Sequence, residues 1–116
     1  MTITQLDRIT RELSEEALIG IAAGLVDKHG QPLMGALVSF LGAEHARRRG
    51  EEIPAGVATA VDIQRELASL PARELDAIMG GLLLAQAAAP TDTAAVFYGA
   101  VMALAGQERQ VRQTLN

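Results

Sequence analysis

The sequence predicts an all-α protein of six helices in a single domain. Ala and Leu are abundant, glycine and proline stand mostly between apolar segments, and no segment alternates like a half-buried strand. The chain has 116 residues, of which 49% are hydrophobic and 21% charged. This composition can bury a core and is too apolar for a disordered tail, and the length fits one domain.

The first three expected helices are bounded by capping and breaking residues. A short helix covers 4–13. A longer helix begins after Ser14, whose hydroxyl suits an amino-terminal cap, and runs up to Gly30, which ends it. Pro32 fits the first turn of a third helix, which ends on Arg47 to Arg49 at the negative end of its dipole.

The last three expected helices follow a central connection at 51–56. A short helix covers 58–69, and a long helix covers 71–88 with a proline at its start. The turn at 90–93 precedes a sixth helix that runs to about Thr114. The six helices therefore follow the order short, long, long, repeated twice, which favours a helical bundle.

The two halves of the chain resemble each other in sequence. The segment 9–13 matches 63–67 at every position but one. The later helices match after insertions of three and seven residues near helix junctions, where length changes are tolerated best. We therefore expect one domain, 1–116, built of two similar three-helix halves, about 1–53 and 54–116, with a pseudo-twofold arrangement. Coincidence in a chain rich in alanine and glycine is the alternative.

Four expected helices are apolar on nearly every side over their central stretches. A surface helix of a small bundle shows a polar face instead, and two short helices cannot enclose four such segments. We expect a second copy of the chain to cover the surplus apolar area through a twofold interface. The stretches are 17–26, 33–43, 77–85 and 94–105.

Glycines inside these helices predict close helix packing. Each one costs roughly 1 kcal/mol relative to alanine, so a close backbone approach has to compensate. Gly35 and Gly42 stand seven residues apart on one helical face, as do Gly99 and Gly106. The glycines expected to pack against another helix or in the dimer are Gly20, Gly24, Gly35, Gly42, Gly99 and Gly106.

Two glutamate–arginine pairs have the i, i+4 spacing in the favourable order. Glu44 precedes Arg48, and Glu108 precedes Arg112. Each pair contributes about 0.3–0.5 kcal/mol when it is exposed. Because both pairs lie in line with the apolar stripe, we expect them to fix the register of the dimer. Ordinary pairing within one helix is the alternative.

Charged features that occur in only one half mark a candidate site for a partner. We expect a cytoplasmic, non-enzymatic interaction protein that binds itself and another macromolecule, with a protein as the leading partner. The first alternative is a small nucleic-acid-associated regulator that uses the Arg47 to Arg49 patch. The candidate partner-binding residues are Asp27, His29, Arg47, Arg49, Glu51 and Glu52.

A second alternative is a binder of an apolar small molecule. Tyr98, beside Met102 and Met34, would form the wall of its pocket. In the packed-core interpretation, Phe40 and Phe97 fill core gaps that the glycines leave.

Other classes of function find no support in the residues. The chain has no cysteine, which excludes disulfides, thiolate metal sites and a cysteine nucleophile. His29 and His45 lack the spacing of helical metal ligands, and no serine has a recognisable base, so we expect no metal, cofactor or catalysis. The net charge of −4 argues against a general polyanion binder, and Pro54 disrupts a helix-turn-helix interpretation of 56–61.

The sequence also shows no targeting or membrane signal. The amino-terminal 13 residues carry charges where a secretory signal needs an unbroken apolar stretch. The longest uncharged segments, 77–91 and 93–107, are shorter than the roughly 20 residues of a spanning helix. We therefore expect no membrane partner.

Overall fold

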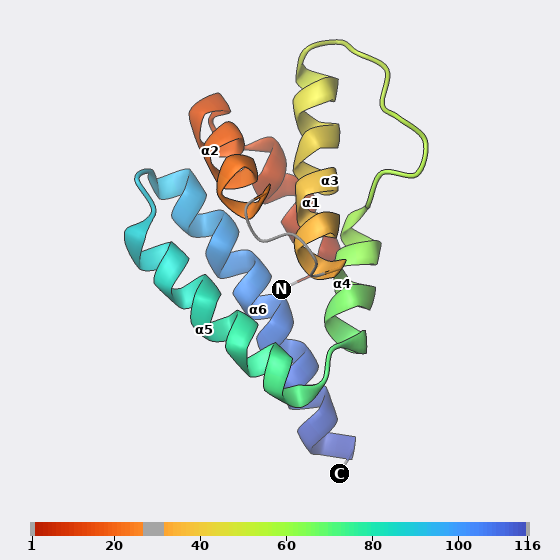
Figure 1. The fold of residues 1–116 in the computed structure, drawn as a ribbon, viewed down its shortest axis with the longest axis vertical. Helices are drawn as coiled ribbons and strands as arrows, with labels where there is room; N and C mark the ends of the chain where they lie inside the picture. Colours follow the sequence, from red (N-terminus) through yellow and green to blue (C-terminus); the bar gives the residue numbers. More distant parts are fainter. Residues whose placement is uncertain (1, 27–31, 116) are drawn as a thin grey trace.

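The fold is a bundle of α-helices, as the sequence predicts (Figure 1). The computed structural model describes residues 2–26 and 32–115, and these residues contain helices, turns and connections but no strand. Each helix end that the structure describes lies within two residues of the expected position, and the expected end of the second helix at Gly30 lies outside the described residues. The helices are α1 (Ile3–Arg11), α2 (Glu15–Val26), α3 (Pro32–Arg48), α4 (Ala60–Ser69), α5 (Ala72–Ala88) and α6 (Asp92–Leu115).

Side-chain caps stand at the starts of four helices, including α6, where Thr91 Oγ1 accepts the Ala94 N–H at 3.2 Å. Thr2 and Gln5 form a capping box at α1, so this helix begins one residue earlier than expected. Thr59 and Asp62 do the same at α4, which therefore begins at residue 60 rather than 58. The Thr59 N–H donates to the Asp62 carboxylate at 2.8 Å, and this hydrogen bond lowers the pKa of Asp62. Ser14 accepts the Ala17 N–H at 3.1 Å and is the cap expected for α2.

A long connection joins α3 to α4. Gly50 and Gly56 have φ angles of 71° and 82°, a left-handed conformation that favours glycine, and they turn the chain at either end of the predicted 51–56 connection. The returning chain is held to α3 because the Ala58 N–H donates to Ser39 Oγ at 2.9 Å.

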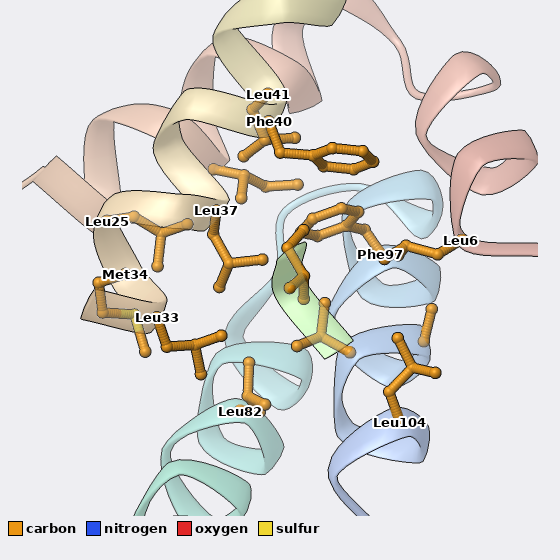
Figure 2. Packing of buried hydrophobic residues seen from close by; sticks show 14 of the residues in the cluster. Leu6, Leu25, Leu33, Met34, Leu37, Phe40, Leu41, Leu82, Phe97 and Leu104 are labelled. Carbon is orange, nitrogen blue, oxygen red and sulfur yellow. The ribbon is translucent and has the colours of Figure 1, made fainter. Parts of the chain in front are cut away.

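The core is one cluster of apolar side chains around α6, which contacts α1, α2, α4 and α5 (Figure 2). Phe97 and Val101 are fully buried on the inner face of α6, and Leu6 and Leu37 reach the cluster from α1 and α3. Phe40 is also buried, which confirms the core role expected for both phenylalanines. Among the described helices, none combines the length and hydropathy that a membrane span requires.

Two of the helical glycines pack against α5 of the same chain. A Cβ added to Gly99 would lie 2.7 Å from Gln86 Nε2, and one added to Gly106 would lie 3.7 Å from Met79 Cε. The Gln86 amide occupies the space beside Gly99 and donates to the Ala95 carbonyl at 3.2 Å. Within the described chain, the neighbours of Gly99 and Gly106 are therefore side chains of α5 rather than a closely approaching backbone, and the helix packing expected of these two glycines in a dimer stays a prediction.

The other four candidate glycines are open. A Cβ added to Gly20, Gly24, Gly35 or Gly42 would meet no described atom within 4 Å. No described helix of this chain therefore lies against them, and the role expected for them in a dimer stays a prediction.

Replacing Gly99 with leucine should loosen the α5–α6 hairpin. We expect Gly99→Leu to lower the free energy of unfolding by about 1–3 kcal/mol, because its side chain displaces the Gln86 amide. Gly106→Ala is the control: its methyl group fits at ordinary contact distance, so stability should rise by up to about 1 kcal/mol. Urea unfolding followed by circular dichroism measures both, and equal stability of the Gly99→Leu variant and the wild type would contradict the described packing.

Candidate functional site

An apolar cleft of about 530 Å³ lies between the α2–α3 pair and α5. Small residues form much of its wall, including Gly24 on α2 and Ala77 and Gly81 on α5, so the two sides do not fill the space between them. Clefts of this volume hold small molecules or the side chains of a partner. The lining residues are Gly24, Leu25, Pro32, Leu33, Met34, Leu70, Glu74, Ala77, Ile78, Gly81, Leu82, Ala85 and Tyr98.

Two polar side chains reach this cleft. Burial raises the pKa of the Tyr98 phenol, so the hydroxyl stays protonated at neutral pH. Glu74 stands in the first turn of α5 and is the only charged residue of the described lining. The cleft can therefore cover an apolar group and can offer one neutral hydroxyl and one carboxylate at its margin.

Part of this wall was expected from the sequence. Met34 and Tyr98 line the cleft, whereas Met102 is partly buried against the core. The α5 residues Ala77 and Gly81 were missed. A helix that is apolar on nearly every side carries no signal for which face remains open.

The cleft continues onto an exposed apolar edge of α5. Ala77, Gly81, Leu84 and Ala88 follow one another at spacings of four, three and four residues, so they share one helical face. Ala77 and Gly81 line the cleft, and Leu84 next to them is 73% exposed. Ile19 on α2 is also exposed, at 51%, but lies about 120–140° around that helix from the cleft-lining Gly24 and Leu25. Leu84 is therefore the large apolar side chain that stands in solvent beside the described cleft.

The first glutamate–arginine pair joins α3 to α1. Arg48 Nε lies 3.2 Å from Glu44 Oε1, which confirms the expected i, i+4 pair. Arg48 Nη2 also donates to the carbonyls of Thr10 and Arg11, both at 3.2 Å. These carbonyls belong to the last turn of α1, beyond the regular i to i+4 hydrogen bonds of the helix, and the Thr10 carbonyl also accepts the Leu13 N–H at 3.2 Å. Arg48 therefore adds a side-chain cap to the end of α1.

The second pair makes the same kind of contact between α6 and α4. Arg112 Nε lies 2.9 Å from Glu108 Oε1, and its Nη2 donates to the carbonyls of Leu67 and Ala68 at 3.2 and 3.0 Å. Both carbonyls lie near the end of α4. All these contacts are within one chain, and the expected role of the two pairs in dimer register stays a prediction.

A charged network surrounds Glu44, which is only 5% exposed. Its carboxylate pairs with Arg47 as well as Arg48. Glu15, at the start of α2, pairs with Arg48 at 3.3 Å and with His45 Nδ1 at 2.9 Å, so the network joins α1, α2 and α3. Glu15 was missed in the sequence because a first-turn glutamate is adequately explained by the helix dipole.

Four of the six candidate partner-binding residues lie at the end of α3 and just after it. Arg47 pairs with Glu44, and Arg49 Nε lies 3.0 Å from Glu51 Oε1, so both exposed arginines have carboxylate partners. Glu52 is exposed beside them. Asp27 and His29 lie outside the described residues. The side chains form a surface of mixed charge rather than a basic patch.

The described residues hold no evident metal centre. Within 2–26 and 32–115, no group of three histidine, cysteine or acidic side chains could hold a metal ion. No family model matches the chain, and no curated protein or solved structure gives a significant match. The cleft and the charged end of α3 are therefore the features on which a function can be proposed.

Removing the two capping arginines should affect stability unequally. We expect Arg48→Met to lower the free energy of unfolding by about 2 kcal/mol and Arg112→Met by about 1 kcal/mol. The order follows from burial, since the side chain of Glu44 is 7% exposed and that of Glu108 is 22% exposed. Urea unfolding at one protein concentration compares the variants, and a greater loss for Arg112→Met would contradict this order.

Proposed function

We propose that this chain is a non-enzymatic helical interaction protein that homodimerises through its exposed apolar helix faces and offers its charged end to a protein partner. The observation that carries the proposal is the exposed apolar edge of α5, where the neighbouring residues Leu83 and Leu84 are 56% and 73% exposed. On α2, Ile19 is a further large apolar side chain that is 51% exposed. Large apolar side chains that gather at exposed faces mark interaction surfaces more often than scattered single ones do.

The solvent-accessible surface supports a second copy as the occupant. The chain exposes 6771 Å², whereas the scaling for monomeric proteins of 12.2 kDa gives about 6,060 Å². The excess of about 700 Å² is close to the roughly 800 Å² that each partner buries in a standard interface. The radius of gyration, 13.7 Å, is near the value of about 13.4 Å expected for 116 residues, and the extents of 46 × 31 × 26 Å show that an elongated shape contributes part of the excess.

The open glycines support the same occupant. Gly20, Gly24, Gly35 and Gly42 each lower the helix propensity by roughly 1 kcal/mol relative to alanine. Within the described part of the chain, no atom lies close enough to these glycines to compensate for that cost. A helix from a second copy can approach them closely because they carry no side chain.

The charged end of α3 suits a protein partner better than nucleic acid. Arg47 and Arg49 are paired with carboxylates, and Glu51 and Glu52 add negative charge beside them. Nucleic-acid affinity depends on cations that neutralise phosphates, and the chain carries a net charge of −4. A mixed-charge surface instead offers paired donors and acceptors to the polar rim of a protein interface.

The cleft favours a second candidate function, the binding of an apolar small molecule. Its volume of about 530 Å³ falls within the range of ligand pockets, and Met34 and Tyr98 belong to its wall. A small molecule bound in the cleft would leave Leu84 exposed at the margin of the cleft. This candidate predicts a monomer that binds one apolar ligand, whereas the leading proposal predicts a dimer.

The molar mass in solution distinguishes the proposed homodimer from the monomeric binder of a small molecule. We expect light scattering after size-exclusion chromatography to give twice the chain mass of 12.2 kDa at about 10 µM, with no loss of dimer at high salt. The thermal midpoint should rise with protein concentration, since association stabilises the folded state. A monomer mass over the whole micromolar range would contradict the proposed homodimer.

A further inference from the structure

We infer that the cleft beside α5 receives Leu84 of a second copy, with the two α5 helices crossing antiparallel at Gly81. This inference rests on the proposed homodimer and specifies its contact surface. It joins two features that are otherwise separate, an unfilled apolar cleft and the most exposed large apolar side chain of the described residues.

One helix supplies both halves of this contact. Ala77, Ile78 and Gly81 of α5 line the cleft, and Leu84 projects from the continuation of the same apolar face. In a twofold interface, a residue on the axis contacts the same residue of the second copy. A residue three positions after the axis contacts the residue three positions before the axis in the other copy. With Gly81 on the axis, Leu84 of each copy therefore lies over Ile78 and Ala77 of the other. Each leucine then fills the cleft of the opposite chain.

Gly81 is the position where two helices can approach most closely. A Cβ added there would meet no described atom outside its own helix within 4 Å, so nothing in the described part of the chain requires a glycine at this position. Gly80 is equally open but lies about 100° around the helix and does not line the cleft. Gly81 is therefore placed at the crossing, and Gly80 is the neighbouring glycine for comparison.

The chemistry of the edge favours another α5 as the occupant. From Ala77 to Ala88 the helix has no charged residue, so an antiparallel pair that crosses at Gly81 buries no charge. Glu74 lies seven residues from the crossing, opposite Ala88 of the second copy, and stays at the solvated margin. A small apolar ligand could fill the cleft but would leave Leu84 in water, whereas a second α5 covers both.

The first test places a carboxylate at the exposed leucine. We expect Leu84→Asp to raise the dimer dissociation constant about a hundredfold, measured by sedimentation equilibrium, because an unpaired carboxylate would enter the apolar cleft. Helicity of the single chain should not change, since Leu84 is 73% exposed. Val111→Asp is the control: this residue is 52% exposed on α6, outside the cleft, and its substitution should leave the dissociation constant unchanged.

The second test compares the two neighbouring glycines. Gly81→Ala should raise the dimer dissociation constant about tenfold, because a methyl group at the crossing separates the helices. Gly80→Ala should raise it less, because Gly80 lies beside the contact face rather than at the crossing, and both substitutions should increase the helix propensity of α5 to the same extent. Equal effects of the two alanines on dimerisation would overturn the crossing at Gly81.

The outcomes distinguish this inference from the proposal on which it rests. A wild-type dimer that persists in Leu84→Asp would overturn the cleft contact and leave the homodimer standing. A monomeric wild type, with or without an apolar molecule bound in native mass spectrometry, would overturn both. Loss of the dimer in Leu84→Asp and Gly81→Ala but not in Val111→Asp and Gly80→Ala is the expected result.

Discussion

The packing of α6 against four other helices is the interaction on which the rest of the described structure depends. Its inner face places Phe97 and Val101 at the centre of the apolar cluster, and α1, α2, α4 and α5 all rest on it. The chain has only three aromatic residues, so glycine and alanine occupy many positions where bulky side chains would fill space. The centre is therefore well filled, while the region between the α2–α3 pair and α5 is left as a cleft.

The ends of the bundle depend on a different interaction, the two arginine caps. Arg48 and Arg112 each connect the last turn of a short helix to the end of a long one. A guanidinium suits this role because its donors reach a carboxylate and two carbonyls at once. The two arginines are aligned by the predicted repeat, and the construction of the chain from two related halves stays a prediction.

Much of the fold could be predicted from local signals, because helix caps and breakers act through neighbours in the sequence. Ser14, the phenylalanines in the core and the ends of most helices follow from such signals. The partners of Arg48 could not be predicted, since its acceptors are main-chain carbonyls of α1, which are chemically alike at every residue. The capping boxes at Thr2 and Thr59 were missed, although the side chains that form them stand three residues apart in the sequence.

The candidate site was harder to predict because glycine has no side chain to indicate its environment. Gly99 and Gly20 look alike in the sequence, yet Gly99 faces Gln86 and Gly20 is open. The difference depends on how α5 lies against α6, which is a property of the whole bundle. For the same reason, only part of the cleft wall, Met34 and Tyr98, was anticipated.

The crossing of two α5 helices is tested most directly by distances between spin labels on single cysteines introduced into this cysteine-free chain. Labels at Arg73, Asp76 and Ala87, all exposed on α5, would be measured between the two copies by pulsed dipolar spectroscopy. An antiparallel crossing at Gly81 predicts axial separations of about 24, 15 and 18 Å, shortest nearest the crossing on either side. A distance that rises steadily from one end of α5 to the other, or the absence of any dipolar coupling, would contradict it.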